Sequence, residues 1–385
     1  MKIALYHTWI YGKGGGERLI LELLKHSKHD ITVFTNHYIQ QTTYPEFRNY
    51  DIRIMGSLPI IGDLFRGVSF SLLTTVSRIP LDKYDALVVS TGGVAEFILF
   101  RNHSKPVLGI CLTPLRAAHD PLLRKEKMKS KNLLSRTLYA IGIKVYKYFE
   151  KKAWKHFDRV LFISKTSLSR ALDDDLIEKT KTGILYPGAD ISSFRAGRYE
   201  HYFLYPSRYS YHKRQDLAVS AFLEFKKRYG TDFKLVLAGG LNPESLDYFK
   251  RIREMSSDSK DIIVKSDVEN KEWLSLYSNC YAVLFCALNE DWGIVPIEAG
   301  ASKKPVISVN EGGPKESVKH EKTGLLVPAE PAAFADAMYR LAKNPDLAKK
   351  MGREGLKESK KYSWMEFVEK FDREVERIIN EDLKR

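Results

Sequence analysis

The first half of the chain alternates short apolar runs with longer segments whose apolar residues recur at helical spacing. The apolar runs are rich in residues that favour strands and are short enough to be buried in a parallel sheet. The segment Gly14–Leu24 opens with three glycines and continues with leucine and isoleucine on one helical face. This rhythm predicts a parallel α/β sheet. Its expected strands are Lys2–Tyr6, Ile31–Thr35, Ala86–Ser90, Val107–Leu112 and Val160–Ser164.

The second half repeats the rhythm, with a helix expected over Asp216–Arg228. The loop-like stretch Tyr186–Tyr199 is expected to join two domains, 1–190 and 200–362. A last amphipathic helix, Trp364–Glu381, is expected to dock, within a segment 363–385 that packs back on the first domain. The strands predicted here are His201–Tyr205, Lys234–Ala238, Ile262–Lys265, Tyr281–Cys286 and Pro305–Val309.

Length and composition narrow the class of protein. A chain of 385 residues is too long for one ordinary core, which agrees with two domains. No apolar stretch approaches the length of a bilayer span, and Met1–His7 is typical of a first strand rather than a signal peptide. Cys111, Cys280 and Cys286 have neither metal-ligand nor disulfide spacing, which favours a cytoplasmic protein. The net charge of +14 predicts an anionic partner such as nucleic acid, anionic lipid or a phosphorylated substrate.

The segment Arg124–Lys155 is crowded with lysine and arginine, and large apolar residues from Leu133 to Phe149 recur within it at helical spacing. A basic amphipathic helix of this kind can lie on an anionic membrane surface. The alternative is a core helix with a solvated basic face, because lysine stems beside an apolar stripe are also common on soluble helices. The sequence leaves both interpretations open.

Two glutamates, Glu290 and Glu298, follow the buried run Tyr281–Leu288. Pro296 suits the first turn of a helix, so Glu290 is expected on the loop that leaves the strand and Glu298 in the helix. In an open α/β sheet this is where ligands bind, and the pair can reach one polyhydroxylated ligand from two sides. Alone, the pair has another reading, in which Glu298 complements the helix dipole and Glu290 is solvated.

Phosphate-binding features follow other expected strands. Gly14–Gly16 can bring backbone N–H groups and a helix N-terminus close to a phosphate. Arg208 and Lys213 follow a strand of the second domain and can neutralise a diphosphate. The glycines of Glu311–Gly313 offer further backbone donors. Each feature alone also fits an ordinary turn or solvated loop, but together they suit a nucleoside-diphosphate sugar, and the absence of a Walker-type loop disfavours an ATPase.

These motifs, in this order, resemble the retaining glycosyltransferases of family 4, and the likeness covers nearly the whole chain. It implies the GT-B fold, in which two Rossmann-like parallel-sheet domains face each other across a cleft, with acceptor bound by the first and donor by the second. The form of Glu290–Glu298 looks most like the mannosyltransferase branch, which uses GDP-mannose.

The resemblance also implies roles for individual residues. Arg208 and Lys213 would bind the diphosphate and stabilise the leaving group, and Glu298 would hold the ribose. Glu290 would contact the transferred sugar. No metal or other cofactor is expected, because the two cations take its place. The remaining donor-binding residues would be Gly15, Gly16, Asp291, Trp292, Gly293, Ile294, Gly312 and Gly313.

The acceptor side departs from the branch pattern. Leu112 stands where the family has a histidine that often contacts the sugar or acts on the acceptor. His119 is a candidate replacement, against the alternative of an ordinary surface histidine. Arg116 and Asp120 match the branch and are expected on the acceptor side. Trp292 replaces the usual phenylalanine, a change expected to reshape the sugar pocket.

The leading hypothesis is a retaining glycosyltransferase that moves mannose from GDP-mannose onto a polyprenyl-linked or other lipid-linked or polysaccharide-type glycan, at the cytoplasmic face of the membrane. The alternatives are a UDP-sugar donor or soluble acceptor on the same fold, a sugar-nucleotide epimerase, and a non-catalytic nucleotide-sugar binding protein. A nucleic-acid partner is not expected, because the charge is spread along both domains and no nucleic-acid motif is present.

Overall fold

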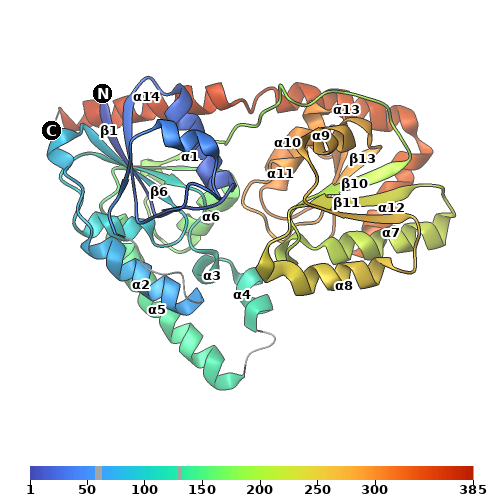
Figure 1. Cartoon of the computed structure of the whole chain (residues 1–385), viewed down its shortest axis with the longest axis horizontal. Coiled ribbons are helices and arrows are strands. Elements are labelled where there is room, and N and C mark those ends of the chain that lie inside the picture. The colour runs from blue at the N-terminus through green and yellow to red at the C-terminus, as the bar shows by residue number, and fades with distance from the viewer. Residues whose placement is uncertain (57–62, 129–131, 385) are drawn as a thin grey trace. The chain divides into compact units, whose positions relative to one another are not determined.

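The computed structural model describes residues 1–56, 63–128 and 132–384. The chain divides into two compact units (Figure 1). Unit 1 comprises Met1–Pro187 and Trp364–Arg385, and unit 2 comprises Gly188–Ser363. The change from one unit to the other at Pro187 falls within the loop expected from the sequence.

Unit 1 is built on a seven-stranded sheet of order β5-β3-β1-β6-β7-β8-β9, and every neighbouring pair is parallel. Its central strands are buried along nearly their whole length, as their continuous apolar sequences predict. Two further short strands, β2 (Trp9–Ile10) and β4 (His37–Tyr38), pair in parallel with each other and form a separate sheet. The sheet strands are β1 (Lys2–His7), β3 (Asp30–Thr35), β5 (Ile52–Ile54), β6 (Ala86–Thr91), β7 (Val107–Cys111), β8 (Arg159–Phe162) and β9 (Thr182–Ile184).

The helices of unit 1 begin at recognisable signals. Gly14 is the N-cap of α1, and Ser164 with Ser167 forms a capping box for α6. The α-helices are α1 (Gly15–His26), α2 (Asp63–Val76), α3 (Arg116–His119), α4 (Pro121–Met128), α5 (Leu133–Trp154), α6 (Lys165–Asp173) and α14 (Trp364–Asp382). Short 3-10 turns are η1 (Pro45–Asn49), η2 (Leu81–Lys83), η3 (Ala95–Phe100) and η4 (Lys179–Lys181).

The last helix, α14, docks on unit 1, as its amphipathic pattern predicts (Figure 1). It buries Phe367, Phe371 and Val375 on one face. The Ser27 hydroxyl, just after α1, donates to Asp372 over 2.6 Å. Packing and this buried polar contact together make α14 part of the first unit.

Unit 2 is a six-stranded parallel sheet of order β12-β11-β10-β13-β14-β15. Helices cover both faces (Figure 1): α7, α8 and α12 pack on one side and α9 and α10 on the other. Its strands are β10 (Tyr202–Pro206), β11 (Lys234–Gly239), β12 (Ile262–Ser266), β13 (Ala282–Phe285), β14 (Val306–Val309) and β15 (Gly324–Val327). Its helices are η5 (Tyr211–Lys213), α7 (Gln215–Tyr229), η6 (Pro243–Ser245), α8 (Leu246–Ser256), α9 (Asn270–Asn279), α10 (Val295–Ala301), α11 (Pro314–Ser317), α12 (Pro331–Lys343) and α13 (Pro345–Ser359).

The strand predictions are confirmed: all ten predicted strands coincide with observed ones to within one or two residues at each end. Both units are therefore Rossmann-like parallel α/β sheets. The strands that sequence reading missed are short, such as β5, β9 and β15.

Helix α5 presents its apolar stripe outward. Leu138, Ile141 and Val145 are 60%, 54% and 52% exposed, while the opposite face buries Glu150, Ala153 and Trp154. The interpretation of this segment as a core helix with a solvated basic face is therefore wrong. Residues 129–131 of the basic segment lie outside the described residues.

Within the described part of the chain, no helix has the length and apolarity needed to cross a membrane. Nor do the described residues contain a group of three or more histidine, cysteine, aspartate or glutamate side chains arranged to hold a metal ion.

Candidate active site

The strand order of unit 2 reverses between β10 and β13, which are neighbours in the sheet but are separated in sequence by β11 and β12. Loops that leave adjacent strands in opposite directions open a crevice at the carboxyl edge, where ligands of such sheets bind. Arg208 and Lys213 follow β10, and Glu290 and Glu298 follow β13. The predicted donor residues of unit 2 therefore come together at its topological switch point.

Buried side chains hold the loop after β10 in place. The Tyr205 hydroxyl donates to the backbone carbonyl of Lys213. The side-chain amide of Gln215, which is fully buried, donates to the carbonyl of Arg208 over 2.9 Å. Arg208 itself is exposed, so a cation is anchored through its backbone and left open to a ligand.

Lys213 and Glu290 form an ion pair, with 2.7 Å between Nζ and Oε2. The two side chains are about one-fifth exposed, at 20% and 23%. A partly desolvated pair attracts more strongly than a surface pair, and both groups remain accessible to a ligand. A cation and a hydroxyl-binding carboxylate thus lie side by side where the sequence predicted them.

Glu298 sits in the first turn of α10, and its carboxylate accepts a hydrogen bond of 2.6 Å from the Tyr277 hydroxyl on α9. Burial raises the pKa of Glu298 from 4.5 to about 7, although the Tyr277 hydrogen bond acts in the opposite direction. The carboxylate is therefore poised to change its charge near neutral pH.

The loop between the two glutamates places its members differently. Gly293 has φ +82°, a conformation that glycine tolerates, and Ile294 is 37% exposed. Asp291 is half-buried. Trp292 is only 4% exposed and packs edge-on against Tyr362, with 5.2 Å between ring centroids. Its ring therefore packs inside unit 2 in this structure, which argues against the expectation that it shapes an open sugar pocket.

Gly312 and Gly313 bring the loop after β14 against the loop after β13. A Cβ on Gly313 would lie 2.5 Å from the Asp291 carbonyl oxygen, and Gly312 has φ +59° beside the Glu290 carbonyl. The Gly313 N–H donates to that carbonyl over 2.7 Å. This corrects one expectation: the Gly313 N–H is used within the protein, so the glycine matters for close approach rather than as a free donor.

Unit 1 has its own switch point between β1 and β6. Gly15 and Gly16 open α1 there, and no atom lies within 4 Å of a Cβ built on Gly15. A Cβ on Gly16 would lie 3.0 Å from Leu112 and 3.6 Å from the ring of His7. His7, which sequence reading missed, is 7% exposed, and burial lowers its pKa to about 4, so it is neutral. Leu112 thus packs at this glycine turn beside a neutral histidine.

The predicted acceptor residues at α3 form ion pairs with other side chains of unit 1. His119 has a fully buried side chain whose ring nitrogens lie 2.6 Å from Glu150 and 2.5 Å from Asp174. Asp120 is also fully buried and takes two contacts from Arg116, at 2.7 and 3.1 Å. Both side chains are therefore enclosed and paired within unit 1 rather than open to an acceptor, which corrects the prediction for His119 and Asp120.

Asp120 also explains where α4 begins, because one of its carboxylate oxygens accepts the N–H groups of Leu122 and Leu123. Burial acts to raise the pKa of Asp120, but the hydrogen bonds and the charge of Arg116 outweigh it and lower that pKa. Arg116 is 17% exposed and is held in place by this pairing.

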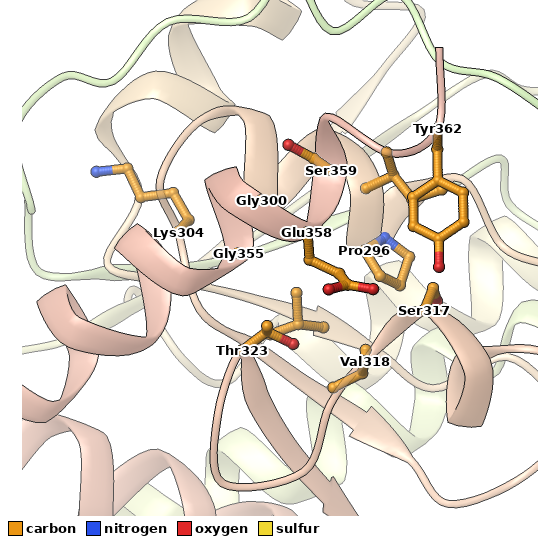
Figure 2. A pocket seen from close by; sticks show the side chains of 12 residues that line it. Pro296, Gly300, Lys304, Ser317, Val318, Thr323, Gly355, Glu358, Ser359 and Tyr362 are labelled. Carbon is orange, nitrogen blue, oxygen red and sulfur yellow. The ribbon is translucent and has the colours of Figure 1, made fainter. Parts of the chain in front are cut away.

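A small pocket lies elsewhere in unit 2, between α10, α11 and α13 (Figure 2). Its described lining includes Ser317, Thr323, Glu358 and Tyr362, and none of the predicted donor residues. Gly300 of α10 makes this helix crossing close, because a Cβ there would lie 2.6 Å from the Gly355 carbonyl oxygen. The pocket therefore arises where these helices pack together and is separate from the site formed by the loops after β10, β13 and β14.

Comparisons with known proteins now identify the class. Residues 189–358 match the model of the family described as glycosyl transferases group 1. In overall structure, the chain is similar to sucrose-phosphate synthase of Thermosynechococcus elongatus (TM-score 0.75, 17% identity, 99% of each chain). It is also similar to HepE of Anabaena, solved with UDP and glucose (TM-score 0.72, 15% identity, 98% of this chain and 99% of that one). The chain therefore has the GT-B fold, and most of its second unit matches a glycosyltransferase family.

Curated relatives narrow the type of transferase. The alpha-1,3/1,6-mannosyltransferase ALG2 of Mus musculus is 26% identical over 405 residues, covering 96% of this chain and 94% of its own. The human enzyme of the same name is 27% identical over 414 residues, with the same coverage. Both relatives are mannosyltransferases, the branch that the motif around Glu290 and Glu298 resembles.

Proposed function

We propose that this chain is a retaining mannosyltransferase that uses GDP-mannose as donor and a lipid-linked glycan as acceptor. The observation that carries the proposal is the switch point of unit 2: Arg208 and Lys213 follow β10, Glu290 and Glu298 follow the neighbouring β13, and Lys213 pairs with Glu290. Two cations suit a diphosphate and two carboxylates suit two sets of hydroxyl groups. The ALG2 relatives favour mannose as the sugar.

In the proposed reaction, the bond between the anomeric carbon and the diphosphate breaks as the acceptor oxygen forms a new bond to that carbon. Arg208 and Lys213 stabilise the negative charge that develops on the leaving diphosphate, which takes up the proton of the acceptor hydroxyl. Glu290 accepts hydrogen bonds from the mannose hydroxyls and Glu298 from the ribose. The two cations supply the charge that a metal ion would otherwise provide. Attack on the same face of the sugar retains its configuration.

In unit 1, Gly15 and Gly16 are proposed to bind a phosphate group through the backbone N–H groups of the α1 N-terminus. The open space around Gly15 supports this role, because nothing in the protein occupies the volume that its missing side chain leaves.

We also propose that α5 lies on an anionic membrane surface at the cytoplasmic face, where a lipid-linked acceptor resides. Seven large apolar residues of the helix are exposed. Lys144, Lys151 and Lys152 are exposed on the same helix, and Lys152 lies 4.4 Å from the centre of the Tyr148 ring. An apolar stripe edged by lysines suits the boundary between lipid tails and anionic headgroups. The exposed apolar residues are Leu133, Leu134, Leu138, Ile141, Val145, Tyr148 and Phe149.

Thermal-shift titration with GDP, UDP and ADP tests the donor site, on the wild type, Glu298→Ala and a control, Glu272→Ala. A ligand that binds only the folded state raises the melting temperature. We expect a GDP-selective shift that Glu298→Ala weakens and Glu272→Ala preserves, because Glu272 pairs with Lys265 instead. A UDP-selective shift would indicate a UDP-sugar donor in place of GDP-mannose. The absence of a shift with any nucleotide, in folded protein, would refute the donor site. The anomeric configuration of the product, read by NMR, tests retention.

A further inference from the structure

One carboxylate contacts both turns that carry the candidate reacting groups of unit 2. An oxygen of Glu311 lies 3.0 Å from a guanidinium nitrogen of Arg214 and 3.4 Å from the backbone nitrogen of Asn289. Arg214 directly follows Lys213, and Asn289 directly precedes Glu290. We propose that Glu311 is a positioning residue that sets the geometry of the Lys213–Glu290 pair. This inference rests on the donor-site function proposed above.

Both contacted residues have a backbone conformation that L side chains rarely adopt. Arg214 has φ +53° and Asn289 has φ +42°. Such a conformation persists in a non-glycine residue only where its surroundings enforce it, and it is common at functional sites. Each of these turns sets the direction in which its neighbour, Lys213 or Glu290, leaves the backbone. The shared carboxylate contacts both turns at their residues with positive φ.

The three loops at the carboxyl edge are also joined through their backbones. The Leu288 N–H donates to the His212 carbonyl over 2.8 Å, and the Gly313 N–H donates to the Glu290 carbonyl over 2.7 Å. These bonds tie the loop after β13 to the loops after β10 and β14. Glu311 is the side chain that reaches from the third loop to both of the others, over 97 residues to Arg214 and 22 to Asn289.

The environment makes this arrangement effective. Arg214 and Glu311 are each 25% exposed, so water competes with their ion pair less than at an open surface. Gly312, next to Glu311, lets the backbone approach the turn at Asn289 closely, because a Cβ there would lie 2.8 Å from the Asn289 carbonyl carbon. This close approach brings the Glu311 carboxylate within reach of both turns.

Loss of the Glu311 carboxylate is expected to affect turnover more than nucleotide binding. A displacement of about 1 Å at reacting groups can lower a rate by about 10²-fold. Arg208 and Glu298 are held by Gln215 and Tyr277 instead, so GDP binding retains its other contacts. Glu311→Gln keeps an acceptor for the Asn289 N–H but loses the charge facing Arg214, so it should fall between the wild type and Glu311→Leu.

The experiment measures kcat and KM for GDP-mannose, the Kd of GDP and the melting temperature for wild type, Glu311→Gln, Glu311→Leu, Arg214→Met and the double variant. Glu321→Leu is the matched control, since Glu321 likewise pairs with an arginine, Arg340, away from these loops. We expect Glu311→Leu to lower kcat by about 10- to 100-fold with a Kd within about threefold. The double variant should be no worse than Glu311→Leu, because both changes remove one interaction.

Turnover at the wild-type rate in folded Glu311→Leu would overturn the inference. So would equal losses in kcat and GDP affinity, or additive losses in the double variant, because either result describes a general structural defect. If wild-type protein binds GDP and transfers mannose, these outcomes concern Glu311 alone. If the wild type binds no nucleotide, the proposed function fails first and the role of Glu311 fails with it.

Discussion

Lys213 and Glu290 lie 77 residues apart in the sequence and 2.7 Å apart in space. In the ligand-free chain they neutralise each other. In the proposed mechanism they bind different parts of the donor: Lys213 binds the diphosphate and Glu290 binds the sugar. Donor binding therefore exchanges one ion pair for two separate contacts, and the ion pair competes with the ligand.

Removal of the competing carboxylate should separate binding from catalysis. In Glu290→Gln, Lys213 no longer faces an anion and is free to meet the phosphates of GDP, so the Kd of GDP should fall by about threefold to tenfold, the effect of about 1 kcal/mol. Mannose transfer should fall by about 10²-fold or more, because the transition state loses its contact to the sugar. Calorimetric titration and an initial-rate assay measure the two effects. Lys213→Met is the counterpart and should weaken GDP binding, whereas full transfer by Glu290→Gln would contradict the assigned role.

The raised pKa of Glu298 predicts that donor binding depends on pH. Its folded-state pKa of about 7 lies above its ordinary 4.5, so at pH 6 much of the carboxyl is protonated. The ionised form is the better acceptor for ribose hydroxyls, so affinity for GDP should rise between about pH 6 and pH 8. Glu298→Gln should abolish the part of this rise that is not due to titration of GDP itself. A pH profile identical in wild type and Glu298→Gln would refute the assignment.

The raised pKa of Glu298 also makes stability depend on pH, but stability should fall as the pH rises. Between pH 4.5 and about 7 the folded state holds a proton on Glu298 that the unfolded state has lost. The free energy of unfolding should therefore fall as pH rises through this window and stay lower above it. In Glu298→Gln this contribution should be absent, which chemical denaturation at pH 5 and pH 8 would measure. The comparison with Glu272→Gln, a surface residue of α9, corrects for other titrating groups.

Sequence patterns located the strands, because buried parallel strands have continuous apolar sequences, and they placed the candidate site residues on the loops that follow those strands. The apolar run before Glu290 predicted both the strand β13 and the place of the glutamate on the loop that follows it. Pairing between residues far apart in the sequence could not be predicted. Nothing local marks Tyr277 as the partner of Glu298, or Arg214 and Asn289 as turns with positive φ that share Glu311. His119 was mispredicted for the same reason. It lies close to the acceptor motif in sequence, but nothing local indicates that it is buried and paired with Glu150 and Asp174.

Gly15 offers a test of phosphate binding that does not disturb packing. A Cβ on Gly15 meets no atom within 4 Å, so Gly15→Ala should leave stability unchanged or raise it slightly. If its backbone binds phosphate, the added methyl group should weaken ligand binding by about tenfold through loss of close approach. Gly142→Ala, also in open space but on α5, is the control. Unchanged binding in Gly15→Ala would remove Gly15 from the site.

Gly300 should matter for stability because it lets α10 cross α13. A Cβ at this position would lie 2.6 Å from the Gly355 carbonyl oxygen, and backbone cannot move aside as a flexible side chain can. Gly300→Ala should therefore destabilise unit 2 by about 1 to 3 kcal/mol. It should also perturb the first turn of α10, where Glu298 sits, so GDP affinity should fall with it. Urea denaturation of this variant beside Gly142→Ala measures the first effect, and an unchanged midpoint would contradict it.

The exposed apolar stripe of α5 is the face that we propose binds a membrane. Leu138, Ile141 and Val145 lie near its middle, each more than half exposed. Replacing all three by glutamine removes apolar area without touching the buried face that holds Glu150 and Trp154. We expect this triple variant to lose binding to vesicles of phosphatidylglycerol and phosphatidylcholine, since insertion depends on buried apolar area.

Co-sedimentation at low and high salt measures that loss. Wild-type binding should weaken with salt and with neutral vesicles, because lysines contribute about 1 kcal/mol each only near an anionic surface. The control is Leu246→Gln, which removes an exposed leucine of α8 in unit 2. GDP binding should be unchanged in both variants, because neither touches the strand-end site. If the triple variant still sediments with anionic vesicles as the wild type does, α5 is not the membrane-binding face, whereas selective loss there with intact GDP binding assigns lipid contact to this helix and donor chemistry to unit 2.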